Sequence, residues 1–250
     1  MADLRGDVIL VTGGSRGIGR AIALDLARAG AEVVIQYRIR RAEALAVVQA
    51  IEAAGGRAIA VEADVSDRAA VEAMAERAGR WRGRLDGVVT AAGVYRGDAT
   101  RSVSPDAWTE PLRVDLDGTF WTVRSTLPWL AGSAHPAIVT VSSVLGAHAA
   151  AGGAAYQAAK AGVEQITRAL ALELAPRVRV NAVAPGFVRT DMNRAGHEDP
   201  EFHRTVRSAT PLGRWGEPDD IAPAVRFLLS RDADWITGIV LGIDGGIALR

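Results

Sequence analysis

Tyr156 and Lys160 are the first residues in this chain whose types and spacing suggest chemistry. They stand four residues apart in AAYQAAKAG (154–162), and Lys160 is the only lysine among 29 Lys and Arg residues. On a helix this spacing places both side chains on one face, so the ammonium can lie near the phenol. A phenol has a free pKa of about 10. A fixed positive charge nearby is expected to lower that pKa, which makes the phenol a usable general acid or base. The alternative is a chance Tyr-x-x-x-Lys pair in a chain whose Arg excess reflects coding bias.

Ser143 is the second candidate catalytic residue, because it ends the apolar run AIVTVSS thirteen residues before Tyr156. A hydroxyl at the carboxyl end of a strand can bind a carbonyl oxygen or a developing alkoxide. Ser142 is the alternative, as a hydroxyl that merely closes the strand. No G-x-S-x-G elbow surrounds either serine, which argues against a hydrolase. The histidines show no metal-like spacing, so we expect no metal site.

The elements that must position these residues alternate between short Val- and Ile-rich runs and amphipathic stretches. Strict alternation predicts right-handed βαβ units and a doubly wound, Rossmann-type α/β fold, with about seven parallel strands and helices on both faces. No linker or repeat interrupts the pattern, so we expect one domain over 1–250. The expected strands are 7–13, 31–37, 57–64, 85–93, 137–143, 178–186 and 238–246, and the clearest helices are 17–29, 41–54, 67–80 and 157–174.

A glycine-rich turn joins the first expected strand to the first expected helix. Gly13, Gly17 and Gly19 follow the spacing G-x-x-x-G-x-G. Without side chains, they let a pyrophosphate approach backbone N–H groups at the positive end of the helix. An ordinary turn is the alternative, but the strand–turn–helix context favours a dinucleotide site.

Composition excludes several other classes of function. The formal net charge is zero and Arg is dispersed, so nothing indicates a nucleic-acid partner or an acidic membrane surface. There is no Cys, which removes disulfides and thiol catalysis. No apolar run approaches the ~18 residues of a membrane span, and the amino terminus lacks the features of a signal peptide. We therefore expect a soluble cytoplasmic protein.

Together, TGGSRGIG, SSV, YQAAK, NAVAPGFVRTDM and the carboxyl-terminal DGG resemble the short-chain dehydrogenase/reductase family, in particular its 3-oxoacyl-acyl-carrier-protein reductases. The resemblance extends over nearly the whole chain. It implies an oxidoreductase that uses a nicotinamide dinucleotide, with Ser143, Tyr156 and Lys160 as catalytic residues. It also implies that Lys160 donates hydrogen bonds to the nicotinamide ribose.

Two positions depart from the family pattern. Asp115 stands where the family usually has Asn, at a helix distortion whose main-chain carbonyl holds a water linked to the lysine. We expect an active enzyme in which the added carboxylate pairs with Lys160 and alters the pH profile. Thr90 and Ala91 replace two Asn residues, and we expect this change to affect stability rather than chemistry.

The charge near the end of the second strand favours NADP(H). NAD-dependent relatives place an acid there, whereas this chain has Tyr37 and Arg38, with Arg16 in the glycine-rich turn. Two guanidinium groups without an opposing acid are expected to bind a 2′-phosphate. NAD(H) stays possible if these arginines are only solvated. The expected cofactor contacts are Gly13, Ser15, Arg16, Gly17, Ile18, Gly19, Tyr37, Arg38, Asp64, Val65, Ala91, Ala92, Gly93, Tyr156, Lys160, Pro185, Gly186, Val188 and Thr190.

The irregular segment of about 187–217 predicts a substrate lid. The favoured activity is NADP(H)-dependent hydride transfer to or from a carbonyl or secondary alcohol, such as a 3-oxoacyl thioester or related ketone. The alternatives are an NAD(H)-dependent alcohol or sugar dehydrogenase and a catalytically silent dinucleotide-binding sensor or scaffold. By the resemblance, Trp108, Trp121 and Trp129 lie on helices of a subunit interface, so we expect core or interface packing. The resemblance also implies a homotetramer or homodimer. The expected pocket residues are Tyr95, Arg96, Ala149, Phe187, Met192 and Trp215.

Overall fold

The centre of the protein is a parallel sheet with the strand order β3-β2-β1-β4-β5-β6-β7. The computed structural model describes residues 3–249. The first three strands are added toward one edge of the sheet and the last four toward the other, so the strand order reverses between β1 and β4. In open sheets of this kind, ligands bind at that point, in the crevice beyond the carboxyl ends of the strands. The predicted doubly wound fold is confirmed. The strands are β1 Val8–Thr12, β2 Glu32–Tyr37, β3 Arg57–Glu62, β4 Gly87–Thr90, β5 Ala137–Val141, β6 Arg179–Pro185 and β7 Val240–Ile243.

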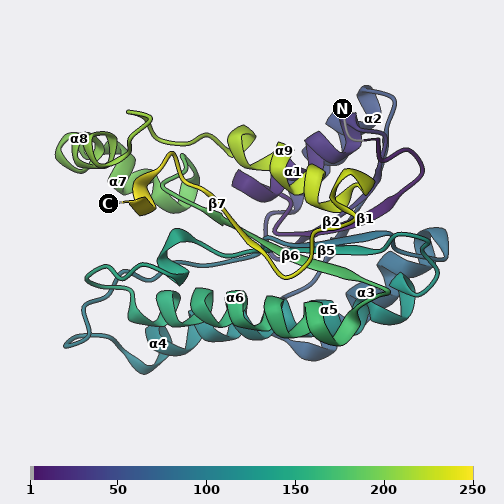
Figure 1. Ribbon diagram of the computed structural model, residues 1–250, viewed down its shortest axis with the longest axis horizontal. Coiled ribbons are helices and arrows are strands. Elements are labelled where there is room, and N and C mark those ends of the chain that lie inside the picture. The colour runs from purple at the N-terminus through teal and green to yellow at the C-terminus, as the bar shows by residue number, and fades with distance from the viewer. Residues whose placement is uncertain (1–2, 250) are drawn as a thin grey trace.

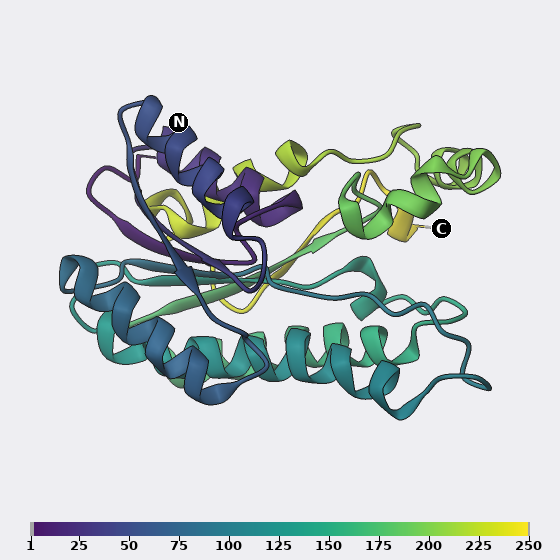
Figure 2. The same ribbon diagram turned by 180° about the vertical axis from the view of Figure 1, so that it is seen from behind.

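Helices cover both faces of the sheet (Figures 1 and 2). One layer holds α1, α2 and α9, the other holds α3 to α6, and α7 and α8 lie at one end of the molecule near the carboxyl terminus. Between residues 3 and 249, no helix is both long and apolar enough to cross a membrane. The helices are α1 Gly17–Arg28, α2 Arg41–Ala53, α3 Arg68–Arg82, α4 Pro105–Pro111, α5 Gly118–Leu130, α6 Ala154–Leu174, α7 Arg194–Glu198, α8 Pro200–Ala209 and α9 Pro218–Leu229.

The strands are buried on both faces, which explains their continuous apolar runs. In β1, Ile9 and Val11 belong to one hydrophobic cluster, and Val8 and Leu10 belong to the other. Alternate residues of a strand point to opposite faces, so β1 contributes to both layers of the core. This packing fixes the position of the carboxyl end of β1, where the candidate site lies.

Observed strand ends fall short of the expected ones on the crevice side. The expected run 85–93 becomes a strand only over Gly87–Thr90, because residues 91–93 leave the sheet and lie beside the glycine-rich turn. The parallel register pairs Thr12 with Thr90. The two loops therefore start at the same level and face the same crevice.

A π-helical turn, Leu112–Asp117, joins α4 to α5, so that residues 105–130 form one continuous helical segment. Such turns insert an extra residue into a helix and are frequent at functional sites. Here the turn contains Asp115, at the position where the resemblance implies a helix distortion.

Candidate active site

Tyr156 and Lys160 lie on one face of α6, as their spacing predicts. The Lys160 Nζ atom is 5.5 Å from the centroid of the Tyr156 ring. Both side chains are buried, and Nζ donates a hydrogen bond of 2.9 Å to the carbonyl oxygen of Val141 at the end of β5. The helix thus presents its phenol and ammonium directly to the carboxyl end of the central sheet.

Ser143 meets Tyr156 from β5. It follows the strand and caps a short 3₁₀ turn, where its Oγ accepts a hydrogen bond of 3.2 Å from the Leu145 N–H. Its hydroxyl lies close enough to Tyr156 to lower the pKa of that phenol. The fold therefore brings together two hydroxyls that are separated along the chain by a surface loop.

Ser142 and Glu164 support this arrangement from behind. The Ser142 hydroxyl lies 3.1 Å from the main-chain oxygen of Lys160 and 3.1 Å from Glu164 Oε1. Glu164 is buried one helical turn beyond Lys160, and the sequence analysis did not single it out. The signal for it was available, because Tyr156, Lys160 and Glu164 follow an i, i+4, i+8 spacing.

The pKa of Tyr156 has opposing influences. Burial raises the pKa of its phenol above the ordinary value, while Lys160 and the Ser143 hydrogen bond lower it. The carboxylate of Asp115 acts in the same direction as burial. The expectation of a lowered pKa is therefore wrong for this structure, since desolvation outweighs the nearby ammonium.

Asp115 lies close to Lys160 and is completely buried. Its Oδ1 accepts a hydrogen bond of 2.8 Å from the Val94 N–H, and its Oδ2 lies 3.8 Å from Lys160 Nζ. Within residues 3–249, Oδ2 has no hydrogen-bond partner. Burial raises the pKa of this carboxyl, and Lys160 opposes the rise.

The glycine-rich turn needs glycine for reasons of both space and conformation. Gly13 has φ +65°, and a Cβ there would lie 2.8 Å from the Cα of Ala92. Gly17 has φ +52°, and a Cβ on Gly19 would collide with the carbonyl of Gly13. This cradle packs backbone against backbone and fits the close approach of a dinucleotide pyrophosphate to the start of α1.

Gln36 also shapes the cradle and was missed by the sequence analysis. Its Oε1 accepts a hydrogen bond of 2.8 Å from the Gly13 N–H, and its Nε2 donates one of 2.6 Å to the carbonyl of Ala63. A buried Gln in an otherwise apolar strand is the signal that could have identified it, because buried polar groups need partners.

The two arginines expected to bind a 2′-phosphate do have opposing acids. Arg38 lies 3.6 Å from Asp64 Oδ2, and Arg16 lies 3.4 Å from Asp191 Oδ2. The expectation of unopposed guanidinium groups is therefore wrong. All four side chains are substantially exposed, so these ion pairs are weak and open to exchange.

Several other expected cofactor residues are buried or already hydrogen-bonded within the protein. Tyr37 packs into the hydrophobic core and its hydroxyl lies 3.3 Å from Glu62 Oε2, so its ring does not face the crevice as a free contact surface. Ser15 and Val65 are also buried, and Ile18 is partly buried. Asp64 accepts hydrogen bonds from the N–H and hydroxyl of Ser66.

The loop that follows β4 packs against Asp115 and Lys160. The Ala92 N–H donates a hydrogen bond of 3.1 Å to Thr12 Oγ1. A Cβ on Gly93 would lie 3.0 Å from Asp115 Oδ1. Ala91 is partly buried, and the buried Thr90 hydroxyl has no hydrogen-bond partner within residues 3–249.

The chain beyond β6 also returns to the glycine-rich turn. Pro185 ends β6, and a Cβ on Gly186 would lie 2.8 Å from the Cα of Asp244. Val188 is buried and forms a bridge with Gly216, while a Cβ on Gly17 would lie 3.3 Å from Thr190 Cγ2. Residues 185–190 therefore border the same crevice as residues 13–19.

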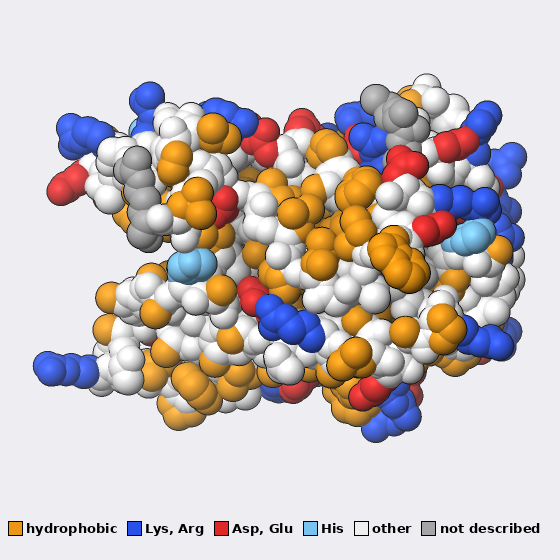
Figure 3. Space-filling view, viewed as in Figure 1, with side chains coloured by type: hydrophobic (Ala, Val, Ile, Leu, Met, Phe, Trp, Pro, Cys, Tyr) orange, Lys and Arg blue, Asp and Glu red, His pale blue; other side chains and the backbone are white. Residues whose placement is uncertain are grey.

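The expected pocket residues are not all placed alike. Tyr95 lies edge-to-face against Tyr156, with ring centroids 5.2 Å apart, and Met192 and Ala149 are exposed. Arg96 forms a 2.6 Å ion pair with Glu110. Figure 3 shows a hollow at one edge of the molecule, below the α7–α8 region.

Trp215 is 1% exposed and packs inside the segment 187–217 rather than on an open pocket wall. Its ring stacks on His203 and contacts Phe187 and Phe202 edge-to-face. The expectation that Trp215 lines the pocket is wrong, because the segment uses this large ring as its own core.

A dinucleotide cradle, a strand-end serine and a Tyr–Lys pair around one crevice define the class of dinucleotide-dependent oxidoreductases. The family model described as enoyl-(acyl carrier protein) reductase matches residues 13–248. The chain belongs to the short-chain dehydrogenase/reductase family.

Known relatives are similar to this chain over almost its full length and their own. An uncharacterized oxidoreductase of Methylorubrum extorquens is 42% identical over 99% of this chain and 100% of its own. A 3-oxoacyl-[acyl-carrier-protein] reductase of Staphylococcus aureus is 39% identical over 95% of this chain and 96% of its own. Among solved structures, a gluconate 5-dehydrogenase from Burkholderia cenocepacia in complex with NADP and tartrate has a TM-score of 0.94 and 32% identity, covering 99% of this chain and 97% of its own.

Proposed function

We propose that this oxidoreductase is NADP(H)-dependent and transfers hydride between the nicotinamide and a carbonyl or secondary alcohol. The observation that carries the proposal is that Ser143, Tyr156 and Lys160 lie close together. Ser143 follows the carboxyl end of β5, and the other two residues lie in the first turns of α6. The neighbouring glycine cradle fits a dinucleotide, which supplies or accepts the hydride when bound.

In the direction of reduction, Tyr156 donates its phenolic proton to the carbonyl oxygen as negative charge develops there. Ser143 donates a hydrogen bond to the same oxygen and holds it beside the phenol. Lys160 stabilises the resulting phenolate. In the direction of oxidation, the phenolate removes the proton of the alcohol, and each residue keeps its position.

We assign the 2′-phosphate of NADP(H) to Arg38 and Arg16. Both guanidinium groups lie near the cradle, and each forms an exposed ion pair with a single carboxylate. A dianionic phosphate is a stronger partner than one carboxylate. The bound NADP in the Burkholderia cenocepacia structure supports this assignment. Lys160 is assigned to the nicotinamide ribose, because its ammonium has three donors and the bond to the Val141 carbonyl uses one of them.

Residues 187–217 are proposed to form the substrate lid of a single-domain enzyme. The segment carries α7 and α8 and is closed at its base by the Val188–Gly216 bridge. Substrates of the relatives indicate two classes, a 3-oxoacyl thioester and a sugar acid. We favour the thioester or a related ketone, because two curated relatives at 39% and 36% identity are 3-oxoacyl-[acyl-carrier-protein] reductases.

The proposed assembly is a homotetramer or homodimer. Phe120 on α5 and Leu172 on α6 are exposed, and a second copy would cover them. Light scattering on purified protein tests this proposal, and a monomer at micromolar concentration would contradict it.

Tyr156→Phe tests the function itself. Without the phenolic hydroxyl, turnover of acetoacetyl thioesters and simple ketones should fall by about 10³-fold or more, while the Kd for NADPH stays within about twofold. Titration with both dinucleotides separates NADP(H) from the NAD(H) alternative. Wild-type protein that binds a dinucleotide but turns over no carbonyl or alcohol would instead identify a silent sensor.

A further inference from the structure

Gln157, next to the proposed general acid, holds a surface loop with its side-chain amide. Its Oε1 accepts a hydrogen bond of 3.0 Å from the Ala150 N–H. Its Nε2 donates to two carbonyl oxygens, at 2.9 Å to Ala150 and at 2.6 Å to Gly152. Three bonds from one half-exposed side chain tie this loop to the helix that carries Tyr156.

The loop held by Gln157 supports a second segment, residues 95–98. The Gly153 N–H donates a hydrogen bond of 3.1 Å to the carbonyl of Asp98. A Cβ on Gly152 would lie 2.9 Å from the carbonyl oxygen of Gly97, and both Gly152 and Gly153 have positive φ angles. The two backbones thus meet at a distance that leaves no room for side chains.

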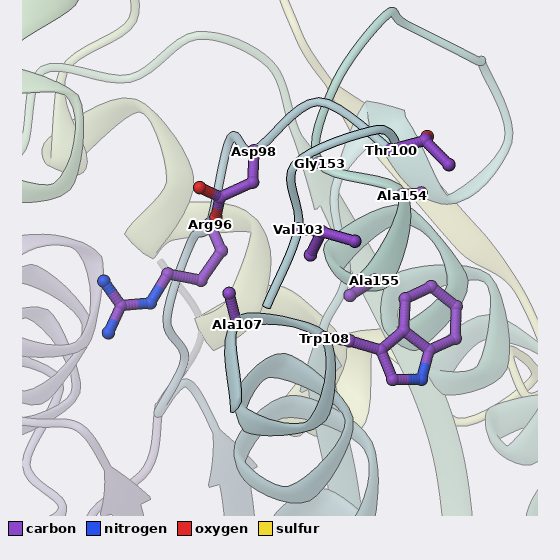
Figure 4. A pocket seen from close by; sticks show the side chains of 9 residues that line it. All are labelled: Arg96, Asp98, Thr100, Val103, Ala107, Trp108, Gly153, Ala154 and Ala155. Carbon is purple, nitrogen blue, oxygen red and sulfur yellow. The ribbon is translucent and has the colours of Figure 1, made fainter. Parts of the chain in front are cut away.

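Segment 95–98 has little support on its other side. A cavity of about 30 Å³ separates it from α4 and from the start of α6, enough for about one water molecule (Figure 4). Arg96 forms an exposed ion pair with Glu110, and Figure 4 shows its side chain directed away from Trp108. The position of this segment therefore depends largely on the loop braced by Gln157.

Tyr95 connects this loop to the candidate active site, because it lies close to Gly153 and contacts Tyr156. A Cβ on Gly153 would lie 3.3 Å from Tyr95 Cε2, and the Tyr95 ring meets the Tyr156 ring edge-to-face at 5.2 Å. Tyr95 is 42% exposed, so its free side faces solvent next to the phenol.

We propose that Gln157 is a positioning residue that determines how large a substrate the site accepts. It fixes the wall formed by residues 147–153 and Tyr95. Binding of a substrate large enough to reach this wall depends on the wall being rigid. A substrate that contacts only Ser143 and Tyr156 does not. The inference rests on the proposed hydride transfer, because it concerns the substrate range of that reaction.

Gln157→Met tests the proposal, since Met has a similar length but cannot form these amide hydrogen bonds. The matched control is Gln165→Met, at an exposed position on the same helix. KM and kcat are measured with NADPH for acetoacetyl and 3-oxodecanoyl N-acetylcysteamine thioesters. For Gln157→Met we expect KM for the long substrate to rise about tenfold, which corresponds to the loss of one or two neutral hydrogen bonds. KM for the short substrate, kcat for both and the Kd for NADPH should change less than about twofold.

Gly152→Ala disturbs the same wall without changing Gln157. Its methyl group would press on the Gly97 carbonyl, so we expect the same preference against the long substrate. Hydrogen exchange reports the loop directly, and the Ala150 amide should lose protection in Gln157→Met but not in Gln165→Met.

Equal effects on long and short substrates, or no effect on either, would overturn the role of Gln157 while leaving the proposed function intact. A wild-type protein inactive on every carbonyl and alcohol would instead overturn the proposed function, and the substrate-range inference with it.

Discussion

Asp115 Oδ2 lies 3.8 Å from Lys160 Nζ, and both side chains are buried beside the phenol of Tyr156. An amide at this position would leave the ammonium without a paired carboxylate. The carboxylate instead reduces the electrostatic support that Lys160 gives to a phenolate. We therefore expect the pH dependence of the enzyme to depend on Asp115.

We expect Asp115→Asn to shift the rising limb of the pH profile for alcohol oxidation to lower pH. The Asp115 carboxylate raises the pKa of Tyr156, so removing its charge lowers that pKa. The measurement is kcat/KM against pH, with Asp117→Asn, an exposed change in the same π-helical turn, as the control. An unchanged limb in Asp115→Asn would show that the carboxylate has no electrostatic role.

Replacing Arg38 with Leu should weaken NADPH binding about tenfold and leave NADH binding within about twofold. A charged hydrogen bond to phosphate contributes about 1.5–3 kcal/mol, and exchange with the exposed Asp64 pair reduces the net gain. Fluorescence titration gives both dissociation constants. Arg57→Leu, at the opposite end of the sheet on β3, should change neither. Equal losses for the two dinucleotides would remove Arg38 from 2′-phosphate recognition.

Arg179 is a candidate stabilising residue remote from the site. It donates hydrogen bonds to the carbonyl oxygens of Leu228, Leu229 and Ser230, where α9 ends. Arg179→Met leaves these acceptors without their donor, so the free energy of unfolding should fall by about 2 kcal/mol. Urea denaturation checks this value against Arg177→Met, an exposed neighbour. Equal midpoints for the two variants would contradict it.

Asp7 should make the stability of the protein depend on pH. Burial, followed by the charge of Asp86, raises the pKa of Asp7 from 3.8 to about 6. A raised folded-state pKa favours the folded form below about pH 4, and this contribution is lost as the pH rises through about 6. Solvent screening of the partly exposed carboxyl reduces the effect to about 1 kcal/mol.

The variant Asp7→Asn should therefore be more stable than wild type by about 1 kcal/mol at pH 8 and equal to it at pH 4. Urea midpoints at the two pH values test the sign, with Glu52→Gln, an exposed carboxyl on α2, as the control. A difference that is larger at pH 4 than at pH 8 would contradict the expectation.

Local sequence patterns were sufficient for the elements and for much of the site. The Val- and Ile-rich runs predicted all seven strands because a parallel strand is buried on both faces, and the i, i+4 spacing placed Lys160 beside Tyr156. Gln36, Gln157 and Glu164 were missed, since a polar side chain reveals its partners only after the backbone has folded.

The sequence by itself determined the doubly wound sheet and the glycine-rich turn, because these follow from periodicity and spacing along the chain. Its resemblance to a known family predicted Ser143, Tyr156 and Lys160 as the catalytic residues. Only the tertiary structure decided that Arg16 meets Asp191, that Trp215 is enclosed by its own segment, and that burial raises the pKa of Tyr156. Ion pairs between distant residues and desolvation depend on how helices and loops pack in space, which local spacing does not encode.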